Sequence, residues 1–437
     1  MKLGTAKSII TPAYPIRLCG YASRNKPFEM IAEDIYLRVH IQEQKGERFL
    51  FVYGDLLWWN SDFISEVRPV LSEKYLIRQE NIWFAASHNH SGPGTGNSFT
   101  ALLETYDKSY GEWLAKQIDK TIEKALDSME NVSIVRYDGS CDLNVYRRKT
   151  DEAGIVRMCP NYYVAADTTL TIIGYYRENG TLKGTLIHYP CHANLSDQNV
   201  LQPDYPGIAL RLMDEQYPES ISMFFQGCTA DLRPNSVLGN QFISCDYSKV
   251  QLFAGRFFEC CQKAIADGGK KIELSSDCYL QSRVKRRQLP LKQEFTGEQI
   301  RKALKSERLE IRQWAEKVLE KDVRSWEELE ISCISYGNEL SFIFINAEIS
   351  QIYAEYARTL YPGCICTAYS NGMIGYLASE TQINEGGYEP EGSALYFALA
   401  GTYKPEIERI IKRAIKELLE ETNTERDAGR HSDGYLL

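Results

Sequence analysis

The sequence predicts an α/β fold in which a mixed, largely parallel sheet core is flanked by helices. Short apolar segments rich in β-branched and aromatic residues alternate along the chain with longer amphipathic segments of helical period. Such alternation is typical of proteins that cover a sheet with helices. Several of the apolar segments end in polar residues, and the ends of parallel strands meet at one edge of a sheet. We therefore expect the active site at the strand ends.

The predicted strands are short and almost continuously apolar. They are Ile35–Ile41, Phe49–Val52, Ile82–Ala86, Thr169–Tyr175, Thr181–Tyr189, Ile221–Phe225, Leu340–Asn346 and Cys364–Tyr369. The predicted helices have apolar residues three or four positions apart. They are Ser61–Tyr75, Ala101–Glu130, Gly207–Gln216, Ser248–Ala266, Thr296–Leu319, Ser350–Leu360 and Tyr403–Leu419. Asn60, directly before the first of these helices, is a capping residue.

Composition excludes several classes of protein. The 437 residues are enough for one large or two closely packed domains. A net charge of -9 argues against nucleic acid as a partner. No run of about 18 apolar residues is present, so we expect no membrane span. The N-terminus lacks the apolar core of a signal peptide, so we expect a cytoplasmic protein. The pattern favours no particular oligomeric state.

The twelve cysteines are predicted to be buried, reduced thiols. Several lie in or beside strand-like segments, and no export signal points to an oxidising compartment. The pair Cys364 and Cys366 has the wrong spacing for a zinc knuckle or a redox motif.

One domain is expected over residues 1–420. Within it, residues 283–331 change composition: a basic cluster precedes a strongly charged segment that we interpret as a solvated helical excursion carrying little chemistry. Residues 421–437 are polar and aperiodic, which predicts a flexible tail.

The most informative segment is His88-Asn89-His90-Ser91-Gly92-Pro93-Gly94, directly after the predicted strand Ile82–Ala86. The chain has only six histidines, and two of them stand within three residues at a strand end. This pattern favours a metal or proton-transfer site.

Two further strand ends carry candidate metal ligands. His192 follows Thr181–Tyr189, and Glu348 follows Leu340–Asn346. Taken alone, His192 would more often be a structural histidine, and Glu348 a favourable charge at a helix N-terminus. Together with His88 and His90 they form a credible set of ligands.

A Gly-rich turn from Tyr369 to Tyr388 and the segment Gln226–Asn235 also follow apolar strands. Backbone N–H groups in such turns can bind an anion or a developing oxyanion. Two imidazoles, one carboxylate and a fourth oxygen donor suit Zn²⁺, which accepts nitrogen and oxygen ligands and leaves a position for water.

These segments, in this order, resemble the N-terminal catalytic domain of the neutral/alkaline non-lysosomal ceramidase family, of which the chain looks like a divergent member. The similarity begins at Ser8-Ile9-Ile10-Thr11-Pro12 and runs to about Tyr396. The segment that begins at His88 looks like the family's His-Thr-His-Ser-Gly-Pro-Gly.

The resemblance implies a zinc ion held by His88, His192, Glu348 and Tyr376. It also implies that His90, Tyr388 and Arg147 are catalytic, the first two stabilising the oxyanion of the reacting carbonyl. Arg148 is the close rival of Arg147 for the family's arginine, and with Asn371 it is expected to contact the substrate. Hydrolysis of a linear amide by zinc-bound water is the activity implied.

The sequence departs from the family at Arg233, where the ceramidases have a serine with a catalytic or substrate-orienting role. A guanidinium prefers a carboxylate or a phosphate. The family's C-terminal Ig-like domain also has no counterpart, so we expect none. We therefore expect Arg233 to bind a small, polar, anionic N-acyl substrate, with ceramide disfavoured. The alternatives are a metal-site enzyme that forms or cyclises an amide, and a non-catalytic ligand-binding protein.

Overall fold

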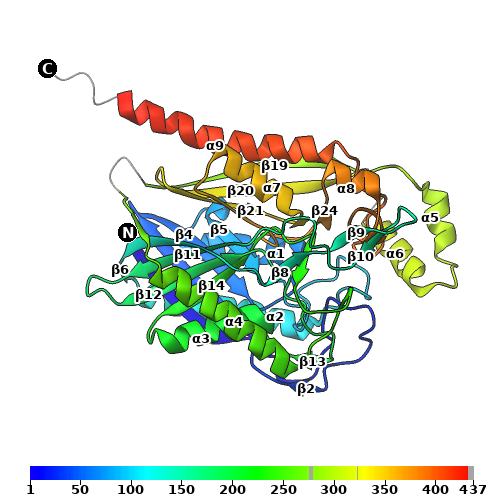
Figure 1. The fold of residues 1–437 in the computed structure, drawn as a ribbon, viewed down its shortest axis with the longest axis horizontal. Coiled ribbons are helices and arrows are strands. Elements are labelled where there is room, and N and C mark those ends of the chain that lie inside the picture. The colour runs from blue at the N-terminus through cyan, green and yellow to red at the C-terminus, as the bar shows by residue number, and fades with distance from the viewer. Residues whose placement is uncertain (275–278, 322, 432–437) are drawn as a thin grey trace.

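The computed structural model describes residues 1–274, 279–321 and 323–431, which form a mixed α/β fold built around three larger sheets (Figure 1). The first sheet has the order β5 (Ile82–Ala86), β4 (Glu47–Gly54), β3 (Tyr36–Gln44), β1 (Lys2–Ile9) and β6 (Glu130–Asn131). The second has the order β14 (Ile221–Gln226), β12 (Leu182–Tyr189), β11 (Thr169–Tyr176), β7 (Ser133–Ser140) and β18 (Lys270–Ile272). The third has the order β19 (Leu280–Pro290), β20 (Trp326–Tyr336), β21 (Leu340–Ile345) and β23 (Cys364–Thr367).

Short two-stranded pairings complete the strands of the described residues. They are β13 (Val200–Leu201) with β2 (Met30–Ile31), β10 (Val156–Met158) with β9 (Arg148–Thr150), β15 (Leu232–Pro234) with β8 (Asn144–Tyr146), β16 (Val237–Leu238) with β17 (Gln241–Phe242), and β22 (Glu348–Ile349) with β24 (Tyr376–Leu377). Two of these pairings, β15 with β8 and β22 with β24, position residues of the candidate site.

The strand directions correct the expectation of a largely parallel core. Most described strand pairs are antiparallel, and each of the three larger sheets has one parallel pair: β4 with β5, β12 with β14, and β21 with β23. The reason is local, because short turns join several neighbouring strands. Lys45 and Gly46, with φ of 53° and 77°, form such a turn between β3 and β4.

Helices cover the outer face of each sheet. The first sheet contacts α1 (Ser61–Tyr75) and α2 (Lys108–Asp127), the second contacts α3 (Asp204–Gln216) and α4 (Tyr247–Ala266), and the third contacts α7 (Gln351–Leu360) and α9 (Ile407–His431). The remaining helical segments are η1 (Gln79–Asn81), α5 (Gly297–Ala303), α6 (Leu309–Glu320), α8 (Glu380–Glu385) and η2 (Tyr388–Gly392). None of the helices in the described ranges has the length and apolar character needed to span a bilayer.

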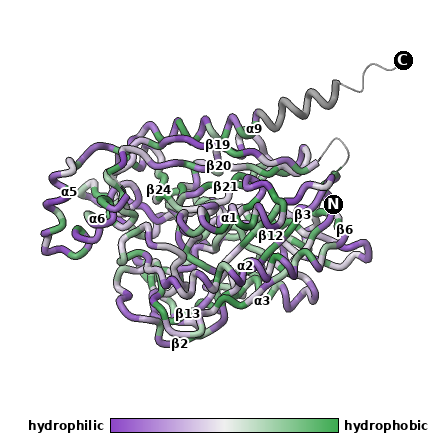
Figure 2. The backbone as a smooth tube through the Cα atoms, turned by 180° about the vertical axis from the view of Figure 1, so that it is seen from behind, coloured by the Kyte–Doolittle hydropathy of each residue, from purple (hydrophilic) through white to green (hydrophobic). Residues whose placement is uncertain are grey.

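The inner faces of the three sheets share one core. Phe51 of β4, Phe225 of β14 and Phe344 of β21 meet there with ring centroids 5.3–6.1 Å apart. Figure 2 shows the hydrophobic segments mainly in the interior of the molecule and hydrophilic segments toward its periphery. Because the three sheets pack on this common centre, the ends of their parallel pairs are brought close together.

Residues 283–331, expected as a helical excursion, begin and end in strands. The basic cluster lies in β19, which pairs antiparallel with β20, and α5 and α6 form an insert between the two strands. The charged side chains hid this strand because β19 is an edge strand, where charge is tolerated and blocks further pairing. Helix α9 continues past residue 421 to His431, whereas 432–437 lie outside the described residues, so the flexible tail stays a prediction.

Candidate metal centre

The candidate site lies where the parallel pairs of the three sheets end. His88 and His90 follow β5 of the first sheet, and His192 follows β12 of the second. Glu348 follows β21 of the third sheet and pairs in register with Tyr376 across β22 and β24. The three parallel pairs thus bring polar strand ends together, as we expected of a largely parallel core.

The three histidines form a buried cluster. His88 Nε2 lies 3.1 Å from His192 Nε2 and 3.2 Å from His90 Nε2. Glu348 Oε1 lies 3.0 Å from His192 Nε2 and 3.6 Å from His88 Nε2. These four side chains are at most 9 % exposed, so they converge in a space shielded from water.

The hydrogen bonds of the histidines decide which ring nitrogen carries the proton. Nδ1 faces a backbone carbonyl in each: Leu57 O at 3.1 Å for His88, Gly20 O at 3.2 Å for His90 and Thr229 O at 3.0 Å for His192. A carbonyl can only accept, so each Nδ1 donates and each neutral ring presents the lone pair of Nε2 to the centre. Three lone pairs at this separation repel one another unless a cation lies between them.

Glu348 adds a negative charge to this centre. Its Oε1 is buried and accepts no hydrogen bond within the described residues. Burial alone would raise the pKa of Glu348, but His88 and His192 outweigh it and hold the pKa well below its usual range. Burial, followed by the positive charge of Arg147, lowers the pKa of His192 to about 3. Burial also holds the pKa of His90 well below its usual range, so at neutral pH the centre combines the neutral imidazoles of His90 and His192 with a carboxylate.

This donor set fits a divalent metal ion that prefers nitrogen and oxygen ligands. The orphaned Glu348 oxygen and the converging Nε2 atoms are the observations that carry the fit. The backbone carbonyls at Nδ1 are the outer partners that usually orient metal-binding histidines. His90 belongs to the cluster geometrically, although the resemblance assigns it to catalysis.

Arg147 also contacts this centre. Its Nη2 donates to the Tyr376 hydroxyl at 3.2 Å, and its Nη1 lies 3.4 Å from His192 Nε2. Glu389 Oε1 accepts from Arg147 Nε at 2.8 Å and so fixes the guanidinium. Arg148 donates through its terminal nitrogens to Glu389, to Gly386 O and to Gln382 O. Arg147 thus faces the cluster, whereas Arg148 braces Glu389 and the turn after α8.

Tyr388 lies beside the cluster. Its ring centroid is 5.6 Å from that of Tyr376, in an edge-to-face arrangement. Burial, and then the negative charge of Glu348, raise the pKa of Tyr388, so its phenol keeps its proton. A neutral phenol can donate a hydrogen bond to an oxygen that becomes negative.

Arg233 enters on β15, which pairs with β8 just before Arg147. Its guanidinium is half-buried and lies 4.7 Å from the centroid of the Phe242 ring. Burial, together with the positive charge of Arg147, lowers the pKa of Arg233. Within the described ranges it forms no ion pair, since Asp231 accepts from Gln351 and Gln382 instead.

Asn371 is not brought to the cluster. Its backbone N–H and side-chain oxygen pair with the backbone of Phe84 in β5, at 2.8 and 2.9 Å. It lines a separate pocket together with residues of α1 and β20. The loop that holds Asn371 contributes Tyr369 instead, whose ring stacks on His88 with centroids 4.0 Å apart.

Sequence reasoning missed two residues that shape the site. Glu389 orients Arg147, and its only sequence signal was its position beside Tyr388. Arg24 is buried and donates to backbone carbonyls of Cys19, His90 and Gln198, among others, and so ties the histidine loop to the segment after His192. No motif marked Arg24, because its partners are backbone atoms.

Comparison with known proteins shows the family of this chain. The model of the family described as neutral/alkaline non-lysosomal ceramidase, N-terminal, matches residues 1–276. The chain belongs to this ceramidase family. The matched region contains His88, His90, His192, Arg147 and Arg233.

The relatives of this ceramidase-family chain are distant in sequence and close in fold. Neutral ceramidase of Pseudomonas aeruginosa is 23 % identical over 250 residues, which is 54 % of this chain and 37 % of that protein. The crystal structure of neutral ceramidase from Pseudomonas aeruginosa matches 96 % of this chain and 74 % of its own length, with a TM-score of 0.74 and 18 % identity. A structure titled ceramidase complexed with C2 matches 96 % of this chain and 75 % of its own length, with the same TM-score and 16 % identity.

Proposed function

We propose that this protein is a zinc-dependent amidohydrolase that cleaves the linear amide of a small, polar, anionic N-acyl compound. The observation that supports it most is the buried convergence of His88, His90 and His192 on the unpartnered Glu348 oxygen. Membership of the ceramidase family supports amide hydrolysis as the reaction class. Its test is incubation of zinc-loaded protein with N-acyl amino acids and measurement of the free amine released.

The residues of the chain divide the work. His88, His192, Glu348 and Tyr376 would hold the metal, which would supply a Lewis acid and lower the pKa of water in the site. The Tyr388 phenol would donate a hydrogen bond to the oxygen of the reacting carbonyl as it becomes negative. His90 presents the lone pair of Nε2 to the same space, so this atom can only accept there. Arg147, fixed by Glu389, orients the Tyr376 hydroxyl and adds a permanent positive charge.

Arg233 would select the substrate. A half-buried guanidinium without an ion-pair partner among the described residues is costly unless a ligand supplies the anion. Because Arg233 stands on the strand beside Arg147, a carboxylate on the substrate can reach it while the amide lies at the metal centre. The acidic group would therefore be held away from the scissile bond.

Arg233→Ser is expected to raise KM for an acidic N-acyl amino acid about tenfold or more, because a charge-assisted hydrogen bond is worth about 1.5–3 kcal/mol. The KM for the corresponding amide-capped, neutral substrate should change little. Steady-state kinetics on the matched substrates, with Arg157→Ser as an exposed control, measures the difference. Equal effects on both substrates would remove the anionic group from the proposal.

Tyr388→Phe is expected to lower kcat about a hundredfold with little change in KM, because an oxyanion donor acts mainly in the transition state. Tyr396→Phe, a substitution on the same segment, should retain activity. A rise in KM with unchanged kcat would instead give Tyr388 a role in ground-state binding.

A further inference from the structure

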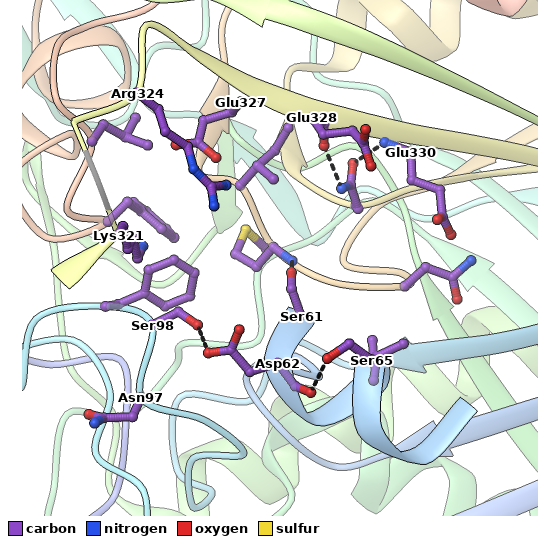
Figure 3. Close-up of a pocket in the computed structure, with 18 of the residues that line it drawn as sticks. Ser61, Asp62, Ser65, Asn97, Ser98, Lys321, Arg324, Glu327, Glu328 and Glu330 are labelled. Atoms are coloured by element: carbon purple, nitrogen blue, oxygen red, sulfur yellow. Dashed lines mark hydrogen bonds between the residues drawn. The ribbon is translucent and has the colours of Figure 1, made fainter. Parts of the chain in front are cut away.

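A second pocket lies between α1, β20 and the insert formed by α5 and α6 (Figure 3). Its volume is about 960 Å³, within the upper range of small-molecule sites. Residues of α1, α6 and β20 line it together with the loops around Phe99, Met373 and Phe397. None of the candidate metal ligands lines this pocket, so any ligand of the pocket would bind apart from the candidate metal centre.

Most charged side chains of this pocket neutralise one another. Arg68 pairs with Glu330 at 3.0 Å, and Arg286 reaches the same carboxylate at 2.9 Å. Lys317 pairs with Glu320 at 2.7 Å on α6. Glu328 Oε1 lies 3.7 Å from Arg286 Nε and balances the second arginine, so these groups together leave no net charge to attract a simple anion or cation.

Three other charged side chains line the pocket and have no ion-pair partner among the described residues. Lys321, Arg324 and Glu327 form no ion pair with any residue that the structure describes. Lys321 and Glu327 are largely withdrawn from water without a close partner. Burial therefore lowers the pKa of Lys321 and raises the pKa of Glu327. The Lys321 ammonium lies 5.0 Å from the centroid of the Phe99 ring at the base of the pocket.

Groups of opposite charge face the hollow from opposite sides. Figure 3 shows Lys321 and Arg324 on one side and Asp62, from the first turn of α1, on the other. Asp62 bonds only to polar groups nearby, the Ser98 hydroxyl among them, and to no cation within the described ranges. Phe99, Phe397 and Met373 form an apolar base between these walls.

We propose that this pocket binds a small zwitterion with an apolar side chain, an amino acid or a short peptide. Its carboxylate would pair with Arg324 and Lys321, and its ammonium with Asp62 on the opposite side. The apolar side chain would rest on Phe99. The balanced lining favours such a ligand over a simple anion, which Asp62 and Glu327 would repel.

Aromatic packing separates this pocket from the metal centre. The Phe99 ring contacts Trp58 with centroids 5.5 Å apart, and Trp58 lies 6.0 Å from the ring of His88. Phe397 of the lining packs on Tyr376 with centroids 5.8 Å apart, so a single aromatic layer lies between the two sites, and no proposed metal ligand lines the pocket itself. This separation makes the inference independent of the proposed amidohydrolase activity.

Isothermal titration of the full chain with L-phenylalanine and with glycyl-L-phenylalanine tests the proposal. We expect at least one of them to bind, and its N-acetylated and its C-amidated forms to bind about tenfold more weakly. Arg324→Met and Asp62→Asn should each weaken binding similarly, whereas Lys305→Met, an exposed substitution on the same insert, should not. His192→Ala should bind the probe as the unchanged protein does.

Three results would overturn the inference. The first is that neither probe binds measurably at millimolar concentration. The second is that the two blocked forms bind as well as the free zwitterion, and the third is that Arg324→Met and Asp62→Asn leave binding unchanged. A stronger loss with His192→Ala than with Arg324→Met would place the ligand at the metal centre and also count against it.

Discussion

His192→Ala is expected to abolish both metal binding and amide hydrolysis. The substitution removes one of the converging Nε2 atoms and leaves the Glu348 carboxylate without the His192 ring that lies 3.0 Å from it. Loss of an outer partner of a metal site already costs about 10–100-fold in affinity, so loss of a direct donor should cost more. Elemental analysis should find about one metal ion per chain in the unchanged protein and a trace in the variant.

His40→Gln is the matched control for this experiment. His40 is equally buried but lies in β3, where its Nε2 bonds to Ile221 O at 2.8 Å, away from the cluster. Its metal content should stay at the level of the unchanged protein. Retention of full metal content and activity in His192→Ala would refute the metal centre, whereas loss in both variants would point to misfolding.

The strand ends could be predicted from the sequence because their signal is local. A short apolar run followed by His88, His192 or Glu348 is visible in a window of ten residues. The convergence of these ends follows from the three parallel pairs, each of which lies at one edge of its sheet. The candidate metal ligands were therefore accessible without any knowledge of the full topology.

The direction of the other strands was not accessible in the same way. β1 (Lys2–Ile9) and β7 (Ser133–Ser140) interrupt their apolar residues with polar ones and were not recognised as strands, and they pair antiparallel with β3 and β11. Antiparallel strands with one covered face alternate in hydropathy and give a weaker signal than continuous apolar runs. The buried central strands therefore dominate the sequence signal, and a parallel order at their ends does not extend to the whole core.

The roles of the two neighbouring arginines also depend on contacts far away in sequence. Arg147 and Arg148 are adjacent and chemically alike, so nothing local distinguishes them. β8 ends at Tyr146 and β9 begins at Arg148, and Glu389 accepts from both guanidiniums. Only this contact, across more than two hundred residues, shows that one arginine faces the histidine cluster and that the other faces the turn after α8.

Glu389→Ala is accordingly expected to destabilise the protein by about 3–5 kcal/mol, because it leaves two buried guanidiniums without their shared carboxylate. The side chains of Glu389, Arg147 and Arg148 are each only 2 % exposed, so water cannot replace the lost partner. The free energy of unfolding, measured by urea denaturation, should fall by this amount. Activity should fall further than stability explains, because Arg147 loses the contact that orients it.

Two further variants separate charge from position. Glu391→Ala removes an exposed carboxylate of the same helical turn that accepts from the Gly387 N–H at 3.2 Å, so the free energy of unfolding should fall by no more than about 1 kcal/mol. Glu389→Gln keeps the shape but loses the charge, so it should retain part of the stability while kcat falls, since an amide holds Arg147 less firmly. If Glu389→Ala were as stable as Glu391→Ala, water would have to solvate both guanidiniums, and Arg147 would not be held toward the metal cluster by Glu389.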